Sequence, residues 1–258
     1  MKPKMLFFDV DGTLLDNHKN IVPPSTINVL QELSKNGYHI AIATGRSYRS
    51  LCELRITDIV HWDMYVCNNG QTILDPNGII VEEHFIPPST VRKCIAVGEQ
   101  YSIPLTIKQM RKMITRTPNQ YVKEASAFFN LPIAPIRTYV GDPVSAIIAY
   151  GPIDYDYAPF LTIPHIKVTP GVSTYADITI EHISKYTGIK KNLEKFQQTK
   201  YVAFGDSNND IEMLQGASIA VAMGQSTPEI QNIADLVTSS VDANGIQQAL
   251  QKLGYIKE

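Results

Sequence analysis

The sequence predicts an α/β fold with a mostly parallel sheet, into which a second α+β unit is inserted. Short apolar runs alternate with helix-like segments along most of the chain. Polar residues and glycines directly follow each run, as they do where parallel strands end at a crevice. Between Glu83 and Ile180, about a hundred residues exceed what the core needs, so we expect a separate unit there.

Five apolar runs bounded by turn residues predict the core strands. They are Met5–Phe8, Ile40–Ala43, Met64–Cys67, Tyr201–Phe204 and Ile219–Met223. Core helices are expected at Ser25–Asn36, Ser47–Ile56, Ser184–Gln197 and Thr227–Ala234. We take Ser25 as the N-cap of the first helix, and Pro228 falls in the first turn of the last. Strands that alternate with helices form a mostly parallel sheet covered on both faces.

The insert defines the domain boundaries that we expect. Residues 1–82 and 181–258 form the core, which includes a hairpin over Ile73–Val81, and residues 83–180 form the inserted unit. Helices are expected in the insert at Ser89–Tyr101 and Asn119–Phe129, and strands at Leu105–Lys108, Met113–Arg116, Val144–Tyr150 and Tyr175–Ile180. The segment Gly151–Gly171, rich in proline and glycine, is left without an assigned element.

The composition argues against nucleic acid and membranes as partners. Lys and Arg number 23 against 25 Asp and Glu, so the formal net charge is −2. No general cationic field would attract nucleic acid or anionic lipid, and no apolar stretch is long enough to cross a bilayer. Cys52, Cys67 and Cys94 are odd in number and form no CxxC pair. We therefore expect buried thiols and a reducing, cytoplasmic location. No feature specifies an oligomeric state.

Asp9-Val10-Asp11-Gly12-Thr13 places two carboxylates at the exit of the first strand. Residues two apart in an extended segment point to the same side, so Asp9 and Asp11 are able to reach one ligand while Val10 faces the core. Gly12 then lets the chain turn sharply. Because two close carboxylates repel, the pair predicts either a hard cation such as Mg²⁺ or a shared proton.

The polar clusters behind the five strands should meet at one edge of the sheet. They are Asp9 with Asp11, Thr44-Gly45-Arg46, Asn68-Asn69-Gly70, Gly205 to Asp210, and Gly224-Gln225-Ser226. The carboxyl ends of parallel strands lie along one crevice. Each cluster alone could equally be a turn, a loop or a helix cap, so the functional interpretation rests on their convergence.

With these motifs in order, the chain resembles the haloacid dehalogenase superfamily of phosphatases, specifically its Cof-type, class IIB sugar-phosphatase branch. The first motif of that family matches Asp9 to Thr13, the second matches Thr44-Gly45-Arg46, and the fourth matches Gly205 to Asp210. The basic residue of the third motif falls on Lys185. The resemblance covers the whole chain. It implies a Rossmann-like core and an inserted cap domain of the C2B type that decides substrate specificity.

The resemblance also implies a covalent mechanism. Asp9 would be the nucleophile that attacks phosphorus and carries an aspartyl-phosphate. Asp11 would protonate the leaving alcohol and then take a proton from water, so it must hold a proton while Asp9 is ionised. Lys185 would offset negative charge on the phosphoryl group and on Asp9.

Metal and phosphate would be bound by the same cluster of residues. The implied ligands of Mg²⁺ are the carboxylate of Asp9, the backbone carbonyl of Asp11, and Asp206, with Asp210 in direct or indirect contact. The implied phosphate-binding residues are Gly12, Thr44, Gly45, Arg46 and Asn209. Arg46 could instead pair at a helix start, and Asn209 could instead serve a turn. Two positions depart from the family pattern, Tyr186 where glycine is common and Gln225 where asparagine is common.

The sequence therefore predicts a Mg²⁺-dependent phosphomonoester hydrolase acting on a small phosphorylated metabolite, such as a sugar phosphate or a phosphorylated cofactor. A phosphomutase or phosphotransferase of the same superfamily is one alternative, and a non-enzymatic module that binds a phosphorylated metabolite is another. Asp11 argues against the non-enzymatic module, because a residue that activates water would shorten the life of an aspartyl-phosphate. Lys108, Arg111, Lys112 and Arg116 either face a second anionic group or lie in water, and we favour water.

Overall fold

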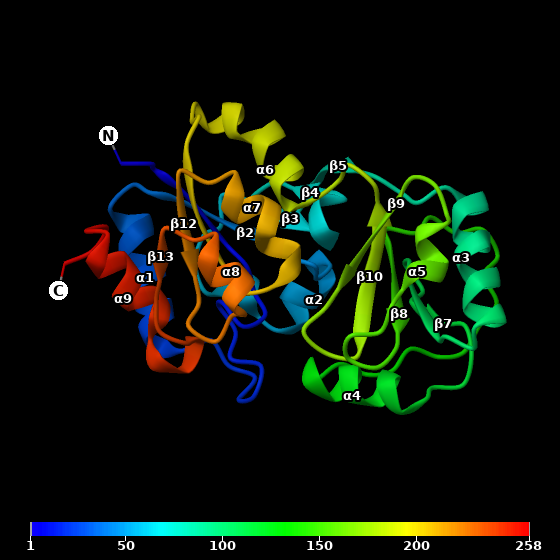
Figure 1. Cartoon of the computed structure of the whole chain (residues 1–258). Helices are drawn as coiled ribbons and strands as arrows, with labels where there is room; N and C mark the ends of the chain where they lie inside the picture. The colour runs from blue at the N-terminus through cyan, green and yellow to red at the C-terminus, as the bar shows by residue number, and fades with distance from the viewer. Residues whose placement is uncertain (1, 258) are drawn as a thin grey trace. The chain divides into compact units, whose positions relative to one another are not determined.

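The chain divides into two compact units (Figure 1). The computed structural model describes residues 2–257. The first unit combines the chain up to Glu83 with the chain from Ser184 onward, and the second unit is His84–Ile183.

The first unit contains an eight-stranded sheet in the order β13-β12-β11-β1-β2-β3-β4-β5. Its strands are β1 (Met5–Phe8), β2 (His39–Ala43), β3 (Met64–Cys67), β4 (Thr72–Leu74), β5 (Ile80–Glu83), β11 (Tyr201–Gly205), β12 (Ile219–Ala222) and β13 (Leu236–Val237). Pairing is parallel from β13 to β3 and antiparallel through β4 and β5. The predicted α/β class with a mostly parallel sheet is confirmed.

Helices cover both faces of this sheet. They are α1 (Pro24–Lys35), α2 (Tyr48–Glu53), α6 (Lys185–Leu193), α7 (Ile211–Gln215), α8 (Pro228–Asn232) and α9 (Gly245–Lys252). Side chains of β1 alternate between the two faces: Leu6 and Phe8 pack with α1, α2 and α9, whereas Met5 and Phe7 pack with α6, α7 and α8. Val10 is also buried in the first of these clusters, as expected. The central strand is thus buried on both sides, and its polar continuation emerges only at its carboxyl end.

The second unit is an antiparallel sheet in the order β7-β6-β8-β10-β9, with three helices. Its elements are α3 (Pro88–Gln100), β6 (Leu105–Lys108), β7 (Met113–Ile114), α4 (Gln120–Phe128), β8 (Ala146–Tyr150), α5 (Ala158–Leu161), β9 (Ile166–Pro170) and β10 (Tyr175–Ile180). One core cluster joins α3 and α5 to Leu105, Ile147 and Ile178, and a smaller one joins α4 to Tyr150. The bounds of β6 and β10 are those predicted.

Several sequence-based expectations need correction. Ser25 is not the N-cap of α1; Pro23 is, with Pro24 at the first helical position, where a fixed φ and a missing N–H suit the helix start. The Ser25 hydroxyl instead donates to Asn244 Oδ1 at 2.6 Å. The periodicity of the sequence did not indicate α5, α7, α9, β9 or β13. Among these, β9 falls in the segment left unassigned and pairs along its whole length with β10.

The expectation of three buried thiols is wrong for one of them. Cys67 and Cys94 are buried, but Cys52 is exposed because α2 directs Leu51 inward instead. All three cysteines are free. Within residues 2–257, no helix combines the length and apolar character that crossing a membrane requires.

Candidate active site

The carboxyl ends of β1, β2, β3 and β11 bring the predicted motifs to one edge of the first unit. Strand β1 lies between β2 and β11, and the Asp9 amide extends its pairing by donating to the Phe204 carbonyl at 3.0 Å. Thr44 is held in the same way, by its amide donating to Val66 O at 2.8 Å. The chain therefore leaves adjacent strands at adjacent positions, which fixes the spacing of the motifs.

Lys185 lies between two carboxylates. Its ammonium donates to Asp9 Oδ1 at 2.6 Å and to Asp210 Oδ1 at 2.7 Å, and its side chain is fully buried. The second oxygen of Asp210 accepts the backbone amides of Asp206 and Ser207, at 3.0 and 3.1 Å. Asp210 thus ties the loop after β11 to the buried ammonium.

Asp206 completes an acidic cluster with Asp9 and Asp210. One carboxylate oxygen of each residue lies within 4.8 Å of the others, and all three residues are buried. Gly12 makes this approach possible: it has a φ of 77°, and a Cβ at this position would collide with the Asp206 carboxylate. Only glycine fits a left-handed turn pressed against a carboxylate in this way.

Burial dominates the electrostatics of the cluster. It raises the pKa of Asp9 to about 7, with Lys185 opposing the rise and Asp210 and Asp11 adding to it. It also raises the pKa of Asp206 well above its usual range, assisted by the carboxylates of Asp9 and Asp210. For Lys185, burial acts to lower the pKa, but the carboxylates of Asp210 and Asp9 outweigh it and raise the pKa. The Lys185 ammonium therefore stays charged, whereas burial favours the protonated forms of Asp9 and Asp206.

The donor set fits a divalent cation. With all three carboxylates ionised, one ammonium leaves two negative charges uncompensated in a buried site. Carboxylate oxygens are the ligands that Mg²⁺ prefers. Asp9 and Asp206 are the better-placed ligands, because both oxygens of Asp210 already accept hydrogen bonds. The cluster contains no side chain of Asp11.

Asp11 instead pairs with Arg46. The guanidinium donates from Nε to Asp11 Oδ2 at 2.8 Å and from Nη2 to Asp11 Oδ1 at 2.7 Å, while Nη1 donates to Ser50 Oγ at 3.0 Å. Such a two-point bond fixes the plane of the carboxylate as well as its position. Asp9 and Asp11, two residues apart, thus have different partners.

The remaining predicted residues lie close by. Thr44 is fully buried, and its hydroxyl oxygen accepts the Arg46 amide at 3.1 Å. Asn209 donates from Nδ2 to Asn69 Oδ1 at 3.0 Å. A Cβ on Gly45 would lie 3.2 Å from Asn69 Oδ1 and 3.5 Å from Asn209 Nδ2, so the second and fourth motifs meet here. The structure brings together every residue that the sequence nominated, while their individual roles stay predictions.

Local sequence explains how Lys185 reaches the cluster. Ser184 caps α6 in a reciprocal arrangement with Thr187, so Lys185 is the first residue of the helix. Gly70, with a φ of 93°, packs against the backbone of Ser184, where a Cβ would collide with the carbonyl oxygen. The turn after β3 therefore sets where α6 begins.

Ser207 supports the fourth motif through hydrogen bonds that were not predicted from the sequence. Its hydroxyl donates to Asn209 Oδ1 at 2.8 Å, and its side chain takes part in a capping box with Asp210. The signature Ser-x-x-Asp at Ser207 to Asp210 was available in the sequence and is typical of a helix start.

The two departures from the family pattern have local explanations. Tyr186 is partly buried beside α7, and a Cβ on Gly216 would collide with its ring. Gln225 donates to the Gly12 carbonyl and accepts the Val241 amide at 3.3 Å, so it bridges the loops after β1 and β13. Tyr186 thus fills space outside the acidic cluster, and Gln225 supports the Gly12 turn.

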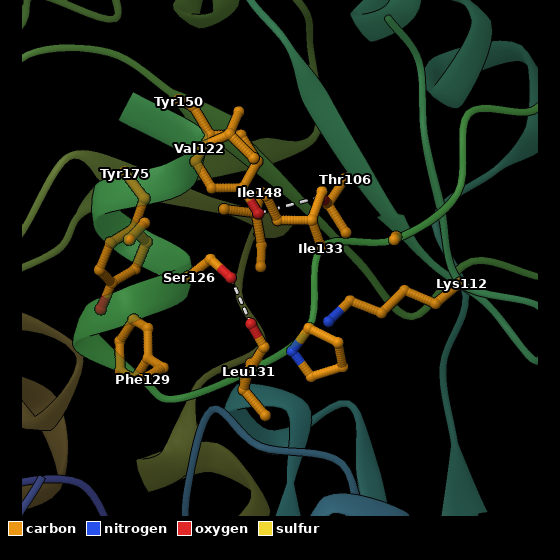
Figure 2. A pocket seen from close by; sticks show the side chains of 13 residues that line it. Thr106, Lys112, Val122, Ser126, Phe129, Leu131, Ile133, Ile148, Tyr150 and Tyr175 are labelled. Atoms are coloured by element: carbon orange, nitrogen blue, oxygen red, sulfur yellow. Dashed lines mark hydrogen bonds between the residues drawn. The ribbon is translucent and has the colours of Figure 1, made fainter. Parts of the chain in front are cut away.

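A pocket in the second unit has a different character (Figure 2). It lies beside α4, its volume is about 50 Å³, and Figure 2 shows Phe129, Ile133 and Tyr175 around it. Tyr150 Oη lies 3.0 Å from Thr106 Oγ1. Among the described residues that line it, none is a carboxylate, a histidine or a cysteine. It is large enough for only a few water molecules, so the polar cluster of the first unit is the candidate active site.

Comparisons with known proteins agree with this placement. The sequence profile described as haloacid dehalogenase-like hydrolase matches residues 6–250. The chain is 29% identical to "Putative phosphatase YkrA" of Bacillus subtilis (strain 168) over 100% of both proteins. It is 23% identical to the 5-amino-6-(5-phospho-D-ribitylamino)uracil phosphatase YitU of the same organism, over 97% of both. Among solved structures, it is similar to the subclass IIB sugar phosphatase BT4131, with a TM-score of 0.87, 27% identity and coverage of 98% of this chain and 99% of that one.

Asp206→Asn tests the metal site independently of activity. Without divalent ions we expect the variant to have a higher Tm than wild type at neutral pH, by roughly 2–4 °C per kcal/mol gained. The reason is that folding buries the Asp206 carboxyl, which must then either stay charged at a cost or bind a proton at a pH above its unfolded-state pKa, and the amide needs neither. Saturating Mg²⁺ should raise the wild-type Tm by at least about 5 °C, since a ligand at a hundred times its Kd contributes about 2.7 kcal/mol. The variant should lose most of that shift.

Differential scanning calorimetry of EDTA-treated protein, with Mg²⁺ added stepwise, provides the measurement. Asp63→Asn is a matched control, because Asp63 accepts the Ile40 amide near the opposite end of β2. It should keep the full Mg²⁺ response. An unchanged response in Asp206→Asn would remove Asp206 from the set of metal ligands.

Proposed function

Since the chain belongs to the haloacid dehalogenase-like hydrolases and is a phosphatase, we propose that it hydrolyses a small phosphomonoester through an aspartyl-phosphate on Asp9. The observation that carries this proposal is that two carboxylates only two residues apart have different partners. The buried Asp9 carboxylate pairs with Lys185, whereas the Asp11 carboxylate pairs with Arg46. We assign the attack to the first carboxylate and the proton transfer to the second. Two carboxylates in distinct surroundings are what such a two-step reaction requires.

Asp9 acts as the nucleophile. A carboxylate oxygen forms a bond to phosphorus while the bond between phosphorus and the alcohol oxygen breaks. Lys185 holds the carboxylate in a fixed position at 2.6 Å and balances part of the charge on the site. Holding the nucleophile in this way removes much of the entropic cost of reaching the reactive geometry.

Asp11 transfers protons in both steps. Asp11 must be protonated when the first step begins; it gives that proton to the departing alcohol oxygen and becomes a carboxylate. The carboxylate then takes a proton from the water that attacks the aspartyl-phosphate, which regenerates Asp9 and protonated Asp11. Arg46 fixes the orientation of the Asp11 carboxylate through two hydrogen bonds. We therefore assign Arg46 the positioning of Asp11 in addition to the phosphate contact that the sequence predicted.

Asp9 and Asp206, with the backbone carbonyl of Asp11, would hold Mg²⁺, and Asp210 would support them by fixing the loop after β11. Mg²⁺, when bound, would supply positive charge to the phosphate oxygens. Thr44, Gly45 and Asn209, with the backbone at Gly12, would bind the phosphate from the neighbouring loops.

The relatives support a proposal for the substrate class. A sugar phosphatase and a phosphatase of a phosphoribityl compound are both similar to this chain over nearly its whole length. We assign this chain a sugar phosphate or a phosphorylated cofactor intermediate, and we assign residues 83–180 the role of a cap that selects the substrate. We place the enzyme in the cytoplasm, since its three cysteines are free and free thiols persist in reducing compartments.

The first experiment compares wild type with Asp9→Asn. Phosphate release from a panel of sugar phosphates and phosphorylated cofactors should require Mg²⁺, stop with EDTA, and fall in the variant by on the order of 10³–10⁶-fold. Turnover falls because the amide is a poor nucleophile. The fold should persist, because the amide has the same shape and Lys185 keeps its bond to Asp210. Turnover retained by Asp9→Asn would rule out Asp9 as the nucleophile; no release by wild type on any substrate would favour a mutase or a binding module.

Asp11→Asn should separate the two steps. We expect turnover to slow by on the order of 10²–10⁴-fold, the usual contribution of a general acid–base group. With a substrate whose alcohol leaves without protonation, such as a nitrophenyl phosphate, the first step should be affected less, so that phosphoenzyme accumulates. Intact-protein mass spectrometry after rapid acid quench detects it. Turnover as fast as wild type would exclude Asp11 from proton transfer.

Arg46→Lys distinguishes the two roles of Arg46. Lysine keeps the charge but cannot form the two-point bond to Asp11. If Arg46 acts through Asp11, kcat should fall by roughly 10–100-fold with little change in KM, because a small misplacement of a reacting group is costly. A rise in KM at constant kcat would instead assign Arg46 to substrate binding alone. Steady-state kinetics on one substrate of the panel provides both constants.

A further inference from the structure

The turn after β3 has an unusual backbone. Asn68, Asn69 and Gly70 all have positive φ, at 50°, 56° and 93°. Asn68 and Asn69 are also buried, each 6% exposed. Left-handed conformations at side-chain-bearing residues cost free energy and persist where the surroundings enforce them, often at functional sites. Asparagine tolerates this conformation better than most residues.

The backbone of this turn is bonded to the second motif. The Asn68 amide donates to the Arg46 carbonyl at 2.9 Å, and the Asn69 amide donates to the Thr44 carbonyl at 3.0 Å. These two bonds hold the turn against the loop after β2, in which the phosphate-binding residues are proposed to lie. The conformation is therefore imposed by the neighbouring loop as well as by the turn itself.

The Asn69 side chain is bonded to the fourth motif. Its Oδ1 accepts Asn209 Nδ2 at 3.0 Å, and Asn209 Oδ1 accepts the Ser207 hydroxyl at 2.8 Å. Both the nitrogen and the oxygen of the Asn209 side-chain amide are thus hydrogen-bonded, which fixes the orientation of the amide. Gly45 lies against this pair, and even a Cβ there would approach Asn69 Oδ1 to 3.2 Å.

The same network extends to the acidic cluster. The amide of Ser207 donates to Asp210 Oδ2 at 3.1 Å, and Asp210 Oδ1 accepts the Lys185 ammonium, which also contacts Asp9. Asn69 is therefore at one end of a continuous set of polar contacts whose other end is the proposed nucleophile. The loop after β2 lies nearest to the Asn209 amide, because Gly45 packs against Asn69 and Asn209. A displacement of that amide would therefore disturb this loop first.

We propose that Asn69 is a positioning residue for phosphate binding, which acts by holding the Asn209 amide against the loop that carries Thr44 and Gly45. This proposal rests on the proposed function for the role of Asn209. Asn69 lies in one of the five polar clusters behind the strands but outside the motifs that were matched to the family. Asparagine meets two requirements here at once, a left-handed backbone and a side-chain acceptor.

Asn69→Gly isolates the side chain from the backbone. Glycine adopts a positive φ without strain, so the turn should keep its shape while the acceptor for Asn209 is lost. We expect kcat/KM to fall about tenfold through KM, and the Kd for inorganic phosphate with Mg²⁺, measured by calorimetry, to rise by about the same factor, which corresponds to ~1.4 kcal/mol. Asn209→Ala should give at least as large an effect.

The double variant provides the decisive comparison. If Asn69 acts through Asn209, the double variant with Asn69→Gly and Asn209→Ala should have the same kcat/KM and the same Kd for phosphate as Asn209→Ala alone. The proposal would be overturned if the fold-changes of the two single variants multiplied in the double variant. It would also be overturned if Asn69→Gly had the kcat/KM and phosphate Kd of wild type. A merely structural role would lower the Tm but would not produce this non-additivity.

Asn244→Gly is the matched control. Asn244 also has a positive φ, 61°, and its side chain accepts one hydrogen bond, from Ser25, on the exposed start of α9. Its replacement should leave both kcat/KM and phosphate affinity unchanged. Wild type that binds phosphate but hydrolyses no substrate would refute the proposed function while the phosphate Kd values still decide the role of Asn69. Absence of phosphate binding by wild type would overturn both.

Discussion

The candidate site depends on burying three carboxylates around one ammonium. Removing a charge from water costs several kcal/mol unless partners compensate it, and Lys185 supplies only one positive charge to Asp9, Asp206 and Asp210. A sheet edge built in this way is under electrostatic stress until a cation or a proton is added. The metal binding expected of the site follows from this imbalance.

Close packing of backbones is what makes the crowding possible. Gly12 and Gly70 both have positive φ and both lack room for a Cβ, one against Asp206 and the other against Ser184. The first brings the loops after β1 and β11 together, and the second sets the start of α6. The positions of the charged groups therefore depend on two glycines, which carry no charge themselves. Replacement of either glycine would move a carboxylate or the ammonium without altering any reacting group.

Much of the fold could be predicted because β1, β2, β3 and β11 are short apolar runs whose polar continuations mark their carboxyl ends. The two-residue strand β13 is too short for a periodic pattern, and β9 ends in a proline and is specified by its pairing with β10. Within the site, residue types identified Asp9 and Asp206. The bond between Lys185 and Asp210 could not be foreseen, since it depends on the direction of α6, which Gly70 and the Ser184 cap determine.

The different partners of Asp9 and Asp11 explain how neighbouring carboxylates can have different roles. A strand alone would direct both toward one ligand. After Asp9 the chain instead leaves the sheet. Arg46, in the loop after β2, binds the Asp11 carboxylate through two hydrogen bonds. Asp9 remains with the buried ammonium and the acidic cluster, whereas Asp11 is held by a guanidinium from another loop. Separate surroundings give identical side chains separate chemistry, so the loop after β2 contributes to the assignment of roles as directly as the motif that contains both aspartates.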